Sequence, residues 1–210
     1  MSEQEEYEAV YHSNYDSYYW TTHFGDTNFS YHGGIAQFYG YTLLRLACDN
    51  VLPFDLTEYA TDIYGRLKEI IAKYESLSLD WSSLEESILL MNTSAISINK
   101  EISDYKEWES GIKRQEDLFV NSLKLRSIND RLMNVDKSFL TDQFLMTDSQ
   151  FYRHILYSLS DDDSYSSDLM PALLNQLSAG NTSQAQFLIK RYATVFKGVA
   201  YSLSDQFIWQ

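Results

Sequence analysis

Residues 81–105 read WSSLEESILLMNTSAISINKEISDY, and the spacing of the apolar side chains in this stretch decides the fold. They recur at alternating steps of three and four residues, at Trp81, Leu84, Ile88, Met91, Ala95, Ile98, Ile102 and Tyr105. This spacing places them along one face of a long helix, which we expect at residues 80–108 with Asp80 as its N-cap. A stripe of this kind is far more often the core of one chain than a site for a coiled-coil partner. Because such seams pack against neighbouring helices at about 20°, the stretch predicts a helical bundle.

Three further segments repeat the pattern, and each has its own apolar face. The predicted helices are 55–75 with Tyr59, Ile63, Leu67, Ile70 and Tyr74; 112–140 with Phe119, Leu125, Ile128, Leu132, Val135 and Phe139; and 183–204 with Phe187, Ile189, Ala193, Phe196, Val199 and Leu203. Asp55 and Glu58 form a capping box at the start of the first of these. A short helix is predicted from Asp168 to Gly180, with Pro171 in its first turn, whereas residues 141–167 have no helical period. The sequence therefore predicts an all-α fold, an antiparallel helical bundle.

The first thirty residues differ from the rest of the chain. Up to about residue 30, tyrosines alternate with small polar residues without a helical period, which predicts loop and short strand. A helix is predicted at residues 29–49, with apolar positions at Ile35, Phe38, Leu43, Leu46 and Ala47. Cys48 is the only cysteine, and its apolar surroundings predict a buried structural thiol. A single cysteine provides neither an intrachain disulfide nor a thiol cluster for a metal.

Composition narrows the classes of partner. The chain has 210 residues, of which 44% are apolar and 15% aromatic, and this excludes a disordered tail. Its net charge of -14 argues against nucleic acid and anionic membrane surfaces, which need a basic face. No run approaches the ~20 apolar residues of a membrane span, so we expect no membrane insertion by this chain. Sequons at Asn28, Asn92 and Asn181 permit glycosylation only on the secretory route.

Several motifs resemble a known family in their order and spacing. They are YHSNYD at 11–16, VLPFDL at 51–56, LSLDW at 77–81, NDRLMNVDKSFL at 129–140, FYRHILY at 151–157 and PALLNQL at 171–177. Together they resemble the C-terminal part of the transferrin receptor-like and glutamate carboxypeptidase-like group of zinc-peptidase proteins. The resemblance implies that residues 1–52 are the end of a zinc-peptidase-like domain. It implies that residues 53–210 are a helical dimerisation domain.

The same resemblance suggests roles for three residues in an intact parent protein. His12 would be a zinc ligand there, with the other ligands and the general-base glutamate preceding Met1. Tyr11 and Tyr165 would line the substrate pocket, although the neighbouring residues 161–163 are all aspartate and would repel an acidic side chain. A catalytic zinc needs about three protein ligands, so His12 by itself makes no site. We therefore expect no catalytic residue and no cofactor in this chain alone, with zinc possible in the parent.

The remaining sequence signals add no other chemistry. His154 lies in an apolar segment and is expected to be a hydrogen-bonded residue of the core. Nucleophile-elbow, P-loop and dinucleotide-binding motifs do not occur in the sequence.

Three functions remain open from the sequence. The chain could be a homodimerisation module without activity of its own. It could be part of a zinc-dependent carboxypeptidase or aminopeptidase. It could be a receptor or cargo-sorting domain that binds another protein. The resemblance implies a membrane-anchored parent at the cell surface or in the endosomal or vacuolar system.

Overall fold

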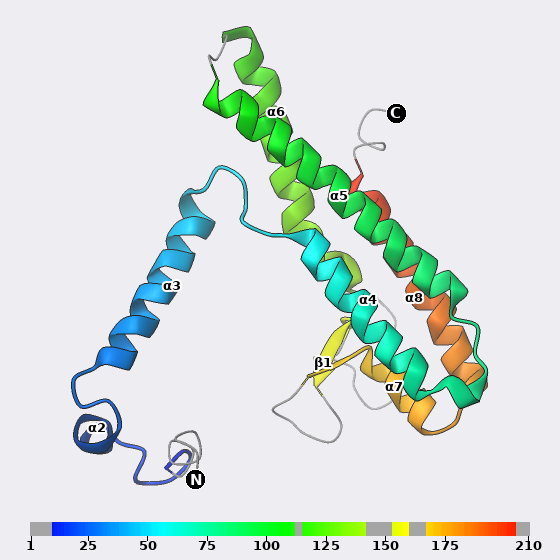
Figure 1. Ribbon diagram of the computed structural model, residues 1–210, viewed down its shortest axis with the longest axis horizontal. Coiled ribbons are helices and arrows are strands. Elements are labelled where there is room, and N and C mark those ends of the chain that lie inside the picture. The colour runs from blue at the N-terminus through cyan, green and yellow to red at the C-terminus, as the bar shows by residue number, and fades with distance from the viewer. Residues whose placement is uncertain (1–9, 112–114, 142–152, 160–166, 205–210) are drawn as a thin grey trace. The chain divides into compact units, whose positions relative to one another are not determined.

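The computed structural model describes residues 10–111, 115–141, 153–159 and 167–204 (Figure 1). The chain divides into two compact units, Met1–Pro53 and Phe54–Gln210. None of the helices in the described ranges combines the length and the apolar character that a membrane crossing needs.

The second unit is a bundle of helices, and the predicted all-α fold is confirmed. Its elements are α4 (Leu56–Lys73), η2 (Glu75–Leu77), α5 (Ser82–Ser110), α6 (Gln115–Asn134), η3 (Asp136–Phe139), α7 (Pro171–Ser178) and α8 (Thr182–Leu203). A pair of short antiparallel strands, β1 (Tyr157–Leu159) and β2 (Ser167–Leu169), lies in the segment without helical period. The sequence did not predict this pair.

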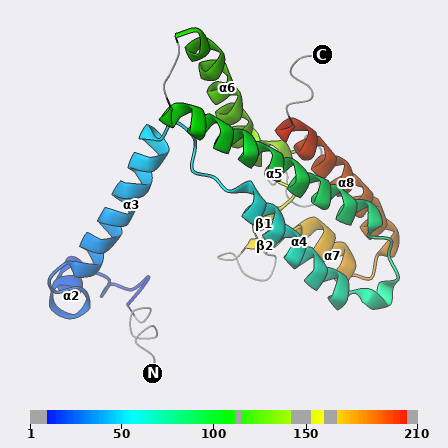
Figure 2. The ribbon, with the colours of Figure 1, turned by 45° about the horizontal axis from the view of Figure 1, so that its top comes forward.

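Helix α5 is the centre of the bundle, and α4 and α8 pack along it (Figures 1 and 2). All eight residues of the predicted seam, from Trp81 to Tyr105, are buried. This burial explains the fold, because each large apolar side chain removed from water stabilises the folded state by about 1.5–3 kcal/mol.

The direction of α8 differs from a fully antiparallel bundle. Helix α4 runs antiparallel to α5, since Lys68 near the end of α4 pairs with Glu85 near the start of α5. Helix α8 runs parallel to α5, because the Gln186 amide exchanges two hydrogen bonds with the backbone of Asp80 at the beginning of both helices. About forty residues separate η3 from α8, enough chain for the two helices to run in the same direction.

Local signals set several helix ends. The Asp55 carboxylate accepts hydrogen bonds from the N–H groups of Thr57 (2.9 Å) and Glu58 (3.4 Å), as the predicted cap requires. Pro171 occupies the first turn of α7. Gly180 follows that helix with φ of 67°, the left-handed conformation that a glycine at this position allows.

Phe139 in η3 packs against both the first and the last helix of the second unit. Its ring lies edge-on to Phe196 of α8, with centroids 5.2 Å apart, and 6.3 Å from Tyr59 of α4. His154 pairs with the neighbouring backbone: its Nδ1 accepts from the N–H of Tyr157 at 3.2 Å, while its Nε2 lies 3.2 Å from the carbonyl of Asp136. The expectation of a hydrogen-bonded His154 in the core region is therefore confirmed.

The described part of the first unit is mainly helical between residues 18 and 48. It contains α2 (Tyr18–Trp20), a π-helical turn η1 (Thr21–Gly25) and α3 (Ser30–Cys48). The predicted short strand does not occur in the described part of the first thirty residues. The helical turns form because Ser17 caps α2, and because Trp20 packs on Gly25, where a Cβ would lie only 2.6 Å from the indole ring.

Helix α3 has the predicted bounds but none of its residues is buried. The predicted apolar positions, Ile35, Phe38, Leu43, Leu46 and Ala47, are all exposed. Cys48 is exposed as well, so the prediction of a buried thiol is wrong for this unit. The physical reason is that, among residues 10–53, no other helix packs a second layer on α3.

Candidate functional site

The hairpin of α5 and α6 is the most open part of the second unit. Figures 1 and 2 show its end reaching beyond α4 and α8. Only the last part of α6 is packed into the bundle, where Ile128 and Leu132 are buried. The earlier part of α6 therefore stands at the surface with its apolar side chains largely exposed.

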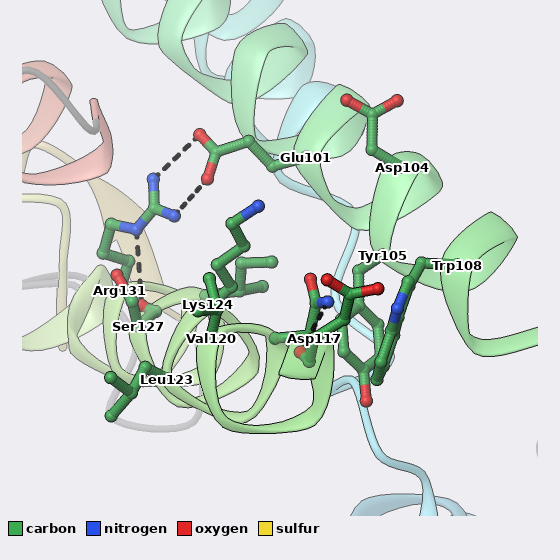
Figure 3. Close-up of a pocket in the computed structure, with 12 residues that line it drawn as sticks. Glu101, Asp104, Tyr105, Trp108, Asp117, Val120, Leu123, Lys124, Ser127 and Arg131 are labelled. Carbon is green, nitrogen blue, oxygen red and sulfur yellow. Dashed lines mark hydrogen bonds and ion pairs between the residues drawn. The ribbon is translucent and has the colours of Figure 1, made fainter. Parts of the chain in front are cut away.

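Arg131 anchors the base of this hairpin. Its side chain is 7% exposed, and its guanidinium contacts both carboxylate oxygens of Glu101 on α5 (Figure 3). The distance from Nη1 to Oε1 is 3.1 Å. Nη1 also donates to the carbonyl oxygen of Leu203 at 2.9 Å, at the last residue of α8. Arg131 thus ties α5, α6 and α8 together with charge-assisted hydrogen bonds.

Above Arg131, α5 and α6 separate and leave a cleft of about 770 Å³. Figure 3 shows its residues, which are Glu101, Asp104, Tyr105, Trp108, Asp117, Val120, Asn121, Leu123, Lys124, Ser127, Ile128 and Arg131. The rings of Tyr105 and Trp108 lie 5.6 Å apart on the α5 side. Burial raises the pKa of Tyr105, and the nearby Glu109 raises it further, so its hydroxyl stays neutral. The cleft is therefore an aromatic and apolar hollow with charged residues at its edges.

A second apolar face of α6 lies beside the mouth of this cleft. We call it the outer α6 face and define it by Phe119, Val120 and Leu123, whose side chains are 72%, 51% and 46% exposed. Val120 and Leu123 also line the cleft, so the face and the hollow are continuous. The sequence prediction placed Phe119 in the core, and the structure corrects this. Phe187 of α8, also predicted to be buried, is 54% exposed.

The signal for the outer α6 face was present in the sequence. Val120 and Leu123 are apolar but fall outside the stripe that runs through Leu125, Ile128 and Leu132. A helix with apolar residues outside its core stripe has a second face to cover. The role of Arg131 had no such signal, because partners from α5 and α8 are brought to it only by the fold.

The residues proposed by resemblance lie elsewhere. Tyr11 and His12 are both in the first unit, and both side chains are exposed. Their rings are stacked, with centroids 3.9 Å apart. Tyr165 lies outside the described residues. Within the described ranges, no three His, Cys, Asp or Glu side chains lie close enough together to hold a metal ion. A zinc site that includes His12 would need further ligands that the described residues do not place near it.

Comparisons with known proteins agree on one family. Residues 79–204 match the transferrin receptor-like dimerisation domain. A probable glutamate carboxypeptidase of Arthroderma benhamiae is 32% identical over 209 residues, which cover 95% of this chain and 27% of the relative. A probable glutamate carboxypeptidase of Arabidopsis thaliana is 34% identical over 164 residues, covering 78% of this chain and 22% of the relative. An inactive zinc metalloprotease of Schizosaccharomyces pombe is 27% identical over 182 residues, 85% of this chain and 22% of the relative.

The chain thus spans about a quarter of the length of these relatives, between 22% and 27% of each. The domain match includes α5, α6, α7 and α8, which means the whole hairpin and its cleft. It extends over more than half of the 210 residues. The chain therefore belongs to the family of proteins that carry the transferrin receptor-like dimerisation domain.

Proposed function

We propose that the second unit, Phe54–Gln210, is a homodimerisation domain that joins two copies of a zinc-peptidase-like protein and has no catalytic activity of its own. The observation that carries the proposal is the outer α6 face. It groups three exposed apolar side chains in a bundle whose seam is otherwise buried, and it lies within the matched domain.

The three exposed side chains of the outer α6 face indicate an interface because they are adjacent to one another. Single exposed apolar residues are ordinary on soluble proteins, because polar atoms cannot cover a whole surface. Phe119, Val120 and Leu123 instead share one side of α6 and continue into an apolar cleft. Contiguous apolar patches rimmed by polar residues are typical of protein–protein interfaces.

The first unit has a separate place in the proposal, as the end of a peptidase-like domain. Helix α3 exposes Phe38, Tyr39, Tyr41, Leu43 and Leu44, which lie on all sides of the helix rather than in one stripe. A helix that is apolar all round is buried in the core of a larger domain. This supports the view that further polypeptide of the parent covers α3.

Light scattering across a dilution series tests the dimer. We expect a discrete dimer mass that persists at micromolar concentration. Leu123→Asp should shift the protein toward monomer, because the contact would have to bury a carboxylate. Ile96→Asp is the matched control, since Ile96 is 57% exposed on α5 away from the outer α6 face. A wild-type monomer at all concentrations would contradict the proposal, and so would a continuous spread of sizes.

A second candidate function is supported by the backbone of His12. Its φ of 61° is in the left-handed region, which non-glycine residues adopt rarely and often at functional sites. In this proposal the intact parent is a zinc-dependent exopeptidase, to which the chain contributes His12 as a ligand and Tyr11 and Tyr165 at the substrate pocket. The names of the glutamate carboxypeptidase relatives support it.

Metal analysis after dialysis tests whether this chain by itself holds the metal of a peptidase. We expect no tightly held zinc, because one histidine is too few ligands. One zinc retained per chain, and lost in His12→Ala, would overturn the assignment of the chain as non-catalytic by itself.

A further inference from the structure

We propose that the two copies meet through α6, each helix lying antiparallel to the other across a two-fold axis near Val120, with Asp117 of each copy opposite Lys124 of the other. This inference rests on the proposed homodimerisation and specifies its contact. It commits the outer α6 face to a second copy of this chain.

The apolar part of the contact follows from positions on one helix. At about 100° per residue, Phe119, Val120 and Leu123 occupy a single arc of α6. An axis near Val120 brings the two Val120 side chains together and sets Leu123 against Phe119 of the second copy. The apolar residues of the face are then covered by their own equivalents, as an isologous contact requires.

The charges decide the direction of the two helices. Asp117 and Lys124 lie on the same edge of the outer α6 face, about two turns apart, and both line the cleft (Figure 3). Neither side chain forms an ion pair with another described residue. In an antiparallel pair related by a two-fold axis, this edge meets the same edge of the second copy in reverse order. Each acid then faces a base, and the pairing occurs twice.

The local charges of the α6 edge fit a second copy, although the overall charge does not. The chain carries a net charge of -14, so two copies repel over most of their surfaces. The edge with Asp117 and Lys124 is one where the two signs are matched, and it is self-complementary. The position of the hairpin allows the approach, since its end extends beyond α4 and α8 in both views (Figures 1 and 2).

Charge reversal in the full chain tests the arrangement. Asp117→Lys and Lys124→Glu each place like charges at both pairs, so each should raise the dimer dissociation constant on the order of tenfold. The double variant restores opposite charges and should dimerise like the wild type. An equimolar mixture of the two single variants should form the mixed dimer in preference to either homodimer. Lys197→Glu on α8 is the control for the charge change and should leave the dissociation constant unaltered.

The outcomes separate this inference from the proposed function. A wild-type dimer whose dissociation constant is unaffected by either reversal overturns the antiparallel α6 contact, while homodimerisation itself stands. Single variants that weaken the dimer without rescue in the double variant also overturn it. A wild-type monomer removes both proposals. Circular dichroism of each variant should match the wild type, because both side chains are exposed.

Discussion

Two residues of the bundle, Ile98 and Arg131, show how burial decides the effect of a single side chain. Ile98 has no exposed surface in α5, whereas Ile96, two residues earlier on the same helix, is 57% exposed. Arg131 is a buried charge whose partners come from α5 and α8. The sequence predicted the place of Ile98 from its spacing, but it could not predict that of Arg131, whose partners are distant in the chain.

Ile98→Asp should unfold the second unit or destabilise it by several kcal/mol, because a carboxylate without a partner would be buried in the core. Ile96→Asp is the matched control, since the same change at an exposed position is expected to alter the free energy of unfolding by less than about 0.5 kcal/mol. Urea unfolding followed by circular dichroism measures both. Equal midpoints for the two variants would mean that Ile98 is not in the core.

Arg131→Met should destabilise the protein by about 2–3 kcal/mol, because it leaves Glu101 and the carbonyl of Leu203 without their donor. This loss of stability is smaller than for a fully buried pair, because the Glu101 side chain is 27% exposed. Arg126→Met is the control, because Arg126 is 81% exposed and its pairing with Asp130 at 3.6 Å is weak. If the two variants unfolded at the same urea concentration, Arg131 would not anchor the hairpin.

At the scale of elements, the helices were predictable and their neighbours were not. The three-and-four spacing placed α4, α5 and α8 within a few residues of their bounds, because periodicity is a local property. The same spacing cannot tell which surface covers an apolar face. Phe119, Phe187 and Cys48 were therefore predicted to be buried and are exposed. The parallel direction of α8 follows from contacts between residues far apart in the sequence, such as Gln186 with Asp80, which spacing alone does not reveal.

The cap of α4 predicts a pH dependence. The ionised Asp55 carboxylate accepts hydrogen bonds from the Thr57 hydroxyl and from the N–H groups of Thr57 and Glu58. These hydrogen bonds, that of the hydroxyl above all, hold the pKa of Asp55 below its usual value. Because the native pKa is depressed, the unfolded chain binds the proton more readily. The stabilisation is therefore present above about pH 4 and is lost as the pH falls through the native pKa.

Asp55→Asn should keep the stability near pH 7, since asparagine caps about as well as aspartate, but should lose less of it on acidification to pH 3. Asp55→Ala should already be about 1 kcal/mol less stable at pH 7. Urea unfolding at the two pH values measures these differences. An Asn variant that lost as much stability as the wild type between pH 7 and pH 3 would contradict the role of the Asp55 charge.

At the scale of the whole molecule, the two units differ in how complete they are. The second unit buries its own seam along α5, and its own side chains cap the first turns of α4 and α8. The first unit leaves every residue of α3 without burial. If α3 is the core helix of a larger domain, its exposed aromatic and aliphatic side chains would drive association that has nothing to do with the dimer contact. The two kinds of association can be separated, because they come from different units.

Removal of residues 1–53 should leave thermal unfolding cooperative, with a midpoint temperature within a few degrees of that of the full chain. The reason is that the core lies within Phe54–Gln210. The shortened chain should still form a discrete dimer, since the outer α6 face is retained. Any larger species that the full chain forms beside the discrete dimer should decrease, because the exposed apolar surface of α3 is gone. Light scattering and circular dichroism on both chains measure these effects. A shortened chain that unfolds without cooperativity would show that the second unit does not fold independently, and a folded monomer would assign self-association to residues 1–53 instead of α6.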